Sequence, residues 1–135
     1  MPNVEEVVRA AIVGSPLASH LGLQVERVEV DRVGVRLPFR REVTTIGDVV
    51  HGGAIASLID TAATAAAWSG ADLEQQSRGT TIGLTVSFLA AGRGQDLVAA
   101  ARVIQRGRTI CVCEVDVAGA DGARVARALV TYKLG

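Results

Sequence analysis

The chain has 135 residues, of which 49% are hydrophobic and 21% are charged, and its formal net charge is zero. This composition predicts a single globular domain over residues 1–135 and excludes a disordered chain. Zero net charge argues against binding to nucleic acid, and no apolar run reaches the roughly 18 residues that a membrane span requires. The N-terminus lacks the pattern of a secretion signal, so we expect a cytoplasmic protein without a membrane partner.

The first fifty residues are predicted to be a helical segment followed by a hairpin. Apolar residues recur at helical spacing near the N-terminus, and Ser15-Pro16 favours a restart of the helix that ends before Gly22. Alternating apolar residues then indicate two strands that turn near Asp31. The expected segments are a helix over 4–13, a short turn over 15–21, strands over 23–30 and 34–39, and a loop over 40–50.

Residues 53–69 are predicted to form one long helix. The segment is rich in alanine and apolar on nearly every side, which is typical of a helix buried all round. Its polar residues are spaced three or four apart and form one stripe: Ser57, Asp60, Thr61 and Thr64.

Four strands are expected after this helix, over 81–88, 96–105, 109–118 and 124–134. Strict alternation in the first of them places Ile82, Leu84, Val86 and Phe88 on one face and Thr81, Gly83, Thr85 and Ser87 on the other. The order of elements predicts an α+β domain with an antiparallel sheet. Because alanines let strands approach closely, we expect the sheet to wrap around the one long central helix.

Cys111 and Cys113 are the only cysteines, and they share one face of a predicted strand. Neighbouring same-face cysteines rarely form a disulfide. With only two histidines in the chain, the pair gives no zinc signature, so we expect no metal site. The two thiols are predicted to be small buried hydrophobic side chains.

The segment that points to chemistry is His51-Gly52-Gly53, followed by Asp60 two turns into the helix. Unpaired N–H groups at a helix N-terminus can hold a negatively charged oxygen, and glycine lets a carbonyl approach the backbone. A carboxylate on an apolar helix is a candidate to orient or deprotonate water. Asp60 is alternatively a loop cap or an ion-pair partner across an interface, and His51 either fixes the loop by a hydrogen bond or transfers a proton.

The stretch from Val50 to Thr61, VHGGAIASLIDT, resembles the signature of the hotdog-fold acyl-CoA thioesterases of the phenylacetic-acid-degradation (PaaI) type. The likeness extends to Leu21-Gly22-Leu23, to 81–89 and to 122–134. It implies a hotdog fold and hydrolysis of a small, medium or aromatic acyl-CoA, with coenzyme A present only as part of the substrate. It also implies a homodimer or homotetramer with active sites at the dimer interface.

The resemblance also implies roles for catalytic residues. The backbone N–H of Gly52 polarises the thioester carbonyl, and Asp60 is the general base or nucleophile. Thr81, contributed by the other subunit, helps to position the water. His51 supports the loop that presents Gly52.

Substrate contacts are expected from Gly53, Thr61 and Thr45. Thr45 stands where family members often carry an asparagine that touches the carbonyl, in a loop that looks one residue longer than usual. Thr44, or Gly52 alone, could serve instead. The candidates for the coenzyme A phosphates are Arg40, Arg41, Arg78, Arg93, Arg106 and Arg108.

Two other functions fit the same residues. A hydratase or dehydratase of the same fold would use His51 with the carboxylate as acid and base on the acyl chain. A non-catalytic module would bind acyl-CoA without releasing a thiol.

Overall fold

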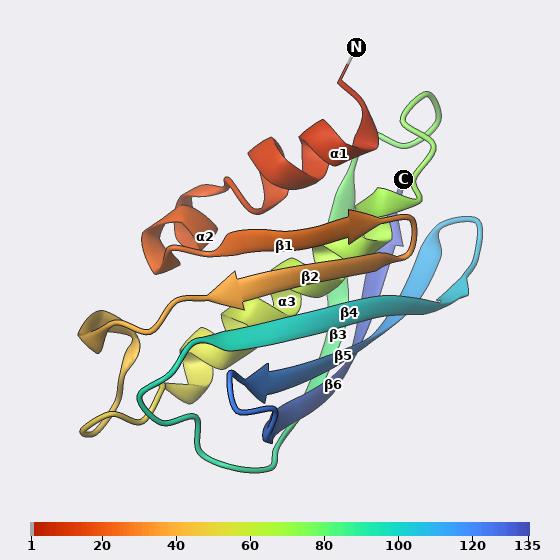
Figure 1. The fold of residues 1–135 in the computed structure, drawn as a ribbon. Helices are drawn as coiled ribbons and strands as arrows, with labels where there is room; N and C mark the ends of the chain where they lie inside the picture. Colours follow the sequence, from red (N-terminus) through yellow and green to blue (C-terminus); the bar gives the residue numbers. More distant parts are fainter. Residues whose placement is uncertain (1) are drawn as a thin grey trace.

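The computed structural model describes residues 2–135 as a six-stranded antiparallel sheet curved around one long helix (Figure 1). The strands are β1 (Gln24–Glu29), β2 (Arg32–Leu37), β3 (Gly79–Phe88), β4 (Leu97–Arg106), β5 (Ile110–Gly119) and β6 (Arg124–Leu134). The long helix is α3 (Gly52–Ser69). The predicted α+β class and the helix wrapped by a sheet are therefore confirmed.

Short helical segments precede the sheet and connect its parts. They are α1 (Val4–Glu6), the π-helical η1 (Val7–Ile12), α2 (Pro16–Leu21) and the 3-10 turn η2 (Arg41–Val43). The side chain of Asn3 caps α1 by accepting a hydrogen bond from the N–H of Glu6 at 2.9 Å. Gly22 ends α2 with φ 74°, a left-handed conformation that glycine adopts without strain.

The strand order is β1-β2-β4-β5-β6-β3. β3 follows α3 in the chain but pairs with β6 at the far side of the sheet, while β4 returns to pair with β2. β3 and β1 are consequently the two edges. α3 connects β2 to β3 and so carries the chain across the concave face to the opposite edge of the sheet (Figure 1).

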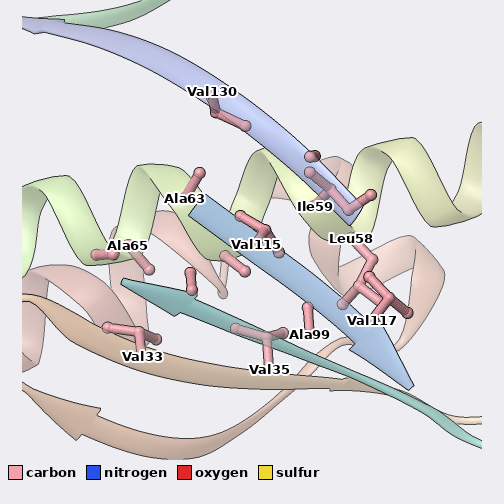
Figure 2. Close-up of a cluster of buried hydrophobic side chains, with 14 of the residues drawn as sticks. Val33, Val35, Leu58, Ile59, Ala63, Ala65, Ala99, Val115, Val117 and Val130 are labelled. Carbon is pink, nitrogen blue, oxygen red and sulfur yellow. The ribbon is translucent and has the colours of Figure 1, made fainter. Parts of the chain in front are cut away.

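The core lies between α3 and the inner face of the sheet. Figure 2 shows Leu58, Ile59, Ala63 and Ala65 of α3 facing valines and an alanine of four strands. The strand residues labelled there are Val33, Val35, Ala99, Val115, Val117 and Val130, and all are at most 2% exposed. Because alanine side chains end at Cβ, the strands can approach the helix axis closely while valine fills the remaining space.

The composition of α3 predicted a helix buried on all sides, and this prediction is wrong for its polar face. Ser57, Asp60, Thr61 and Thr64 are only half-buried. The polar stripe is thus the face of α3 that the chain's own sheet leaves partly open. A carboxylate and three hydroxyls on this face retain access to water, which removes most of the cost of burying them.

A β-bulge in β3 overturns the strict alternation that was expected there. The register shifts between Thr81 and Gly83, so that Thr81 pairs with Tyr132 and Leu84 pairs with Val130. Tyr132 and Val130 both point into the core. Thr81 therefore shares the inner face with Leu84 instead of opposing it, because a bulge adds one residue and redirects the side chain beside it.

Both cysteines are free thiols on the inner face of β5, and Cys111 and Cys113 are 1% and 0% exposed. This confirms that they act as small buried side chains. Burial raises the pKa of the Cys111 thiol. Burial, and next the charge of the neighbouring Cys111, raise the pKa of the Cys113 thiol to about 12.

We expect both thiols to resist alkylation by iodoacetamide at pH 8 in the folded protein and to react fully in denaturant. The folded state holds the Cys113 proton more tightly than the unfolded chain, whose thiol pKa is about 8.5. The resulting contribution to the free energy of unfolding is complete below that pKa and is lost as pH rises toward about 12. Rapid native-state labelling, measured by mass spectrometry, would contradict this burial.

Candidate functional site

The N-terminus of α3 leaves one backbone donor without a protein partner. His51 is the N-cap, and its Nδ1 accepts a hydrogen bond from the N–H of Gly53 at 2.7 Å. The N–H groups of Ala54 and Ile55 donate to the carbonyl of His51 at 3.0 and 3.1 Å. Within residues 2–135, no acceptor is bonded to the N–H of Gly52. That group is available to a ligand oxygen.

A hollow of about 370 Å³ lies beside this free N–H. Its walls include Val50, Gly52, Ile55 and Phe88, together with residues 89–92 that follow β3. A Cβ at position 52 would lie 3.6 Å from the Phe88 ring, in ordinary van der Waals contact. The absence of a side chain at Gly52 therefore keeps the approach to the N–H open.

Asp60 lies two turns further along α3 and is hydrogen-bonded to Thr81. The Thr81 hydroxyl donates to Asp60 Oδ1 at 2.6 Å, and both residues are half-buried. The contact depends on the β3 bulge, which turns Thr81 to the inner face. Within one chain, Thr81 is therefore the hydrogen-bond partner of Asp60.

Tyr132 stands next to this pair and was not singled out by sequence reasoning. Burial raises the pKa of its phenol, the hydrogen bond from Trp68 lowers it, and the negative charge of Asp60 raises it further. Tyr132 is thus a neutral hydroxyl at neutral pH, within the field of the carboxylate. Nothing in the sequence signals this, because the two residues are brought together only by the pairing of β3 with β6.

The two chemical centres on α3 are too far apart to act on one carbonyl within a single chain. Gly52 and Asp60 are separated by eight residues, which corresponds to about 12 Å along the helix axis. Reacting groups must come within roughly 3–3.5 Å of the bond that changes. One chain therefore presents two half-sites, an N–H donor at Gly52 and a carboxylate at Asp60.

Most of the other residues expected to contact the substrate already have hydrogen-bond partners within the chain. The N–H of Gly53 already donates to His51, and the Thr61 hydroxyl donates to the carbonyl of Ser57 at 2.8 Å. Thr45 is exposed in the loop closed by the Thr44–Val50 bridge, with its N–H donating to Val49 at 2.8 Å. The Thr44 hydroxyl donates a hydrogen bond to the carbonyl of Arg41.

The interaction of His51 Nδ1 with the helix favours a supporting role over proton transfer. We expect His51→Asn to retain most of the activity, since asparagine also accepts from the helix N–H groups. His51→Ala should lower the free energy of unfolding by about 1 kcal/mol, as expected for a lost N-cap. Melting temperatures and kcat for the two variants test this; equal losses of kcat would instead indicate proton transfer by the imidazole.

The six candidate arginines are in different environments. Arg106 donates to Asp31 at 2.7 Å and to the carbonyl of Ala67 at 3.1 Å, so it stabilises the C-terminal end of α3. Arg40 donates to the carbonyl of His20, and Arg93 lies 3.5 Å from Asp48. The remaining three are exposed and form no ion pair with the described residues: Arg41, Arg78 and Arg108.

Two further findings concern metal binding and membrane-spanning helices. No group of three or more histidine, cysteine, aspartate or glutamate side chains able to hold a metal ion occurs among residues 2–135. Over the same residues, every helix is too short or too polar to cross a membrane.

Comparison with known proteins places these features in a family context. A family model described as the thioesterase superfamily matches residues 47–126. The chain is 30% identical over 135 residues to a medium/long-chain acyl-CoA thioesterase of Salmonella typhimurium, covering 89% of this chain and 86% of that protein. A thioesterase family protein from Silicibacter pomeroyi has a TM-score of 0.89 at 25% identity, over 98% of each chain. A hypothetical thioesterase from Streptococcus pneumoniae, crystallised with coenzyme A, shares the fold at 23% identity and a TM-score of 0.75, over 84% of this chain and 85% of that one.

Proposed function

Since this chain belongs to the thioesterase superfamily, has its hotdog fold and is a thioester hydrolase, we propose that its substrate is an acyl-CoA with a small or medium aliphatic, or aromatic, acyl group. The observation that carries the mechanism is the half-buried Asp60–Thr81 pair on the open stripe of α3. The similarity to the Salmonella acyl-CoA thioesterase supports coenzyme A as the leaving group.

In this mechanism Asp60 acts on water and Gly52 acts on the carbonyl. Asp60 accepts a proton as the water oxygen bonds to the thioester carbon, while Thr81 holds the carboxylate in position. The N–H of Gly52 donates to the carbonyl oxygen as negative charge develops there. The C–S bond then breaks, the carboxylic acid is released, and the thiolate of coenzyme A takes up the proton.

The distance between the half-sites favours a site shared by two copies of the chain. In a two-fold symmetric dimer, Gly52 of one copy can face Asp60 of the other, and the reverse, which gives two equal sites. The apolar edge of β3 supports such pairing: Ile82 is 55%, Leu84 42% and Phe88 54% exposed. An unpaired edge strand with these side chains is suited to a partner strand.

The coenzyme A moiety is proposed to approach through the hollow beside Gly52. The η2 turn adjoins this region, since the N–H of His51 donates to the carbonyl of Val43 at 2.8 Å. Arg41 in that turn is exposed and unpaired among residues 2–135, so it is the candidate cation for a phosphate.

A thiol-trapping assay on purified protein with a panel of acyl-CoAs tests the proposed function. We expect release of free coenzyme A with saturation kinetics. Saturable binding without a released thiol would identify a non-catalytic acyl-CoA-binding module. Loss of enoyl absorbance from an enoyl-CoA, with no thiol released, would identify a hydratase.

A further inference from the structure

A hollow of about 400 Å³ at the start of β3 carries two basic side chains and no acidic one. It is lined by Arg78, Gly79, Thr80, Lys133 and Gly135. Arg78 and Lys133 are exposed, and neither forms an ion pair with any residue from 2 to 135. The mechanism above uses neither cation.

The backbone holds these side chains on one face of the sheet. The N–H of Arg78 donates to the carbonyl of Gly135 at 2.8 Å, and the N–H of Gly135 donates back to the carbonyl of Arg78 at 2.8 Å. Thr80 pairs with Lys133 in the β3–β6 ladder. Because alternate residues of a strand share a face, Arg78, Thr80 and Lys133 lie on the same side of this ladder. Their donors are within reach of one anion.

The hollow beside Gly52 offers no such charge. Its lining is Val50, Gly52, Ile55, Phe88 and residues 89–92, all of them uncharged. These walls suit the uncharged part of an acyl-CoA, which includes the thioester. The pyrophosphate and the 3′-phosphate of coenzyme A require cations elsewhere.

The two hollows lie at opposite ends of β3. A Cβ on Gly52 would lie 3.6 Å from Phe88 at the end of the strand, whereas Asp60 accepts from Thr81 near its start. A dimer that brings Gly52 of one copy to Asp60 of the other therefore sets the end of one β3 beside the start of the other, as in antiparallel pairing. In this arrangement the basic hollow of one copy adjoins the Gly52 hollow of the second copy.

We propose that Arg78 and Lys133 bind a phosphate group of coenzyme A, in the site to which the same copy contributes Asp60. The inference rests on the proposed function and adds the residues that recognise the phosphates of the substrate. Arginine presents two parallel donors to phosphate oxygens, and lysine adds a compact charge. The Thr80 hydroxyl is a further donor on the same face.

Two thioesters, one with and one without the phosphates, test this recognition. Hexanoyl-CoA carries them, and S-hexanoyl-pantetheine has the same thioester without them. For Arg78→Gln we expect KM for hexanoyl-CoA to rise about tenfold, as for one lost charge-assisted hydrogen bond, with KM for hexanoyl-pantetheine unchanged. Lys133→Gln should have the same selective effect. The control Arg32→Gln changes an exposed arginine of β2, near the opposite edge of the sheet, and should alter neither value.

Mixed dimers test which copy supplies the cations. When Gly52→Pro chains are mixed with Asp60→Asn chains, the one native site takes its Asp60 from the Gly52→Pro chain. Arg78→Gln added to that chain should raise KM of the mixture for hexanoyl-CoA about tenfold. The same change on the Asp60→Asn chain should leave KM as it was.

The outcomes separate this inference from the proposed function. An unchanged KM for hexanoyl-CoA in Arg78→Gln, or an equal rise for both thioesters, would overturn the phosphate site alone. So would a mixed dimer in which Arg78→Gln acts from the Asp60→Asn chain. Absence of thiol release from every acyl-CoA tested with the native protein would overturn the proposed function, and the phosphate site with it.

Discussion

Asp60→Asn is expected to lower kcat for acyl-CoA hydrolysis by about 10²–10⁴-fold, the range typical for loss of a general base. The amide preserves volume and can still accept the Thr81 hydroxyl hydrogen bond through its Oδ1, so the fold and KM should change little. Stopped-time assays of released coenzyme A measure the loss. The expected result is a defect in kcat at unchanged melting temperature.

Asp116→Asn is a matched control for this change. Asp116 lies on β5 between the buried Val115 and Val117, so it is on the face of the sheet opposite to α3, where it is 3.5 Å from Arg127. We expect full activity from it. Activity of Asp60→Asn close to that of the control would show that the carboxylate is structural and that another group activates water.

Gly52→Pro is expected to lower kcat by about 10²–10³-fold, as observed when one oxyanion donor is removed. Proline has no N–H, and it is favoured at the first position of a helix, where that group has no intrahelical partner. His51 has ψ 133°, which a residue before proline readily adopts. The helix should therefore form while its one free donor is lost.

Gly52→Ala distinguishes the role of the Gly52 N–H donor from the role of the open space beside it. Alanine keeps the donor and adds a Cβ that would lie 3.6 Å from the Phe88 ring. We expect it to retain kcat within about tenfold of the native value, far above the proline variant. Equal activity of the two variants would indicate that space, and not the donor, is what Gly52 provides.

The same two variants test whether the site is shared. If Gly52 and Asp60 of different chains form each site, mixing inactive Gly52→Pro with inactive Asp60→Asn restores one native site in each mixed dimer. Random exchange should return about a quarter of native activity. A mixture that stays inactive after exchange, verified by native mass spectrometry, would contradict the shared site.

Much of the fold follows from local patterns. Residues 53–69 carry a helical run with a start signal at His51-Gly52, and α3 extends over Gly52–Ser69. The strand expected over 124–134 matches β6, since Asp121-Gly122 fixes the turn before it. Such signals depend only on residues close together in the chain, so they can be read from a single sequence.

The pairing of strands is different in kind, because it depends on residues far apart in the chain. The four alternating segments after α3 did not reveal that β3 crosses to β6. The bulge at Thr81 was also hidden, since the alternation on each side of it is regular. As a result Thr81 was assigned to the wrong face of the strand.

The sequence by itself determined the class of fold, the helix that carries the site and the two residues, Gly52 and Asp60, on which the proposed chemistry depends. It could do so because the glycines, the histidine cap and the lone carboxylate act through their spacing on one helix. Only the tertiary structure decided that Thr81 donates to Asp60, that Trp68 donates to Tyr132, and that the polar stripe stays partly open. These relations arise from long-range strand register, where a shift of one residue turns a side chain to the opposite face of the sheet.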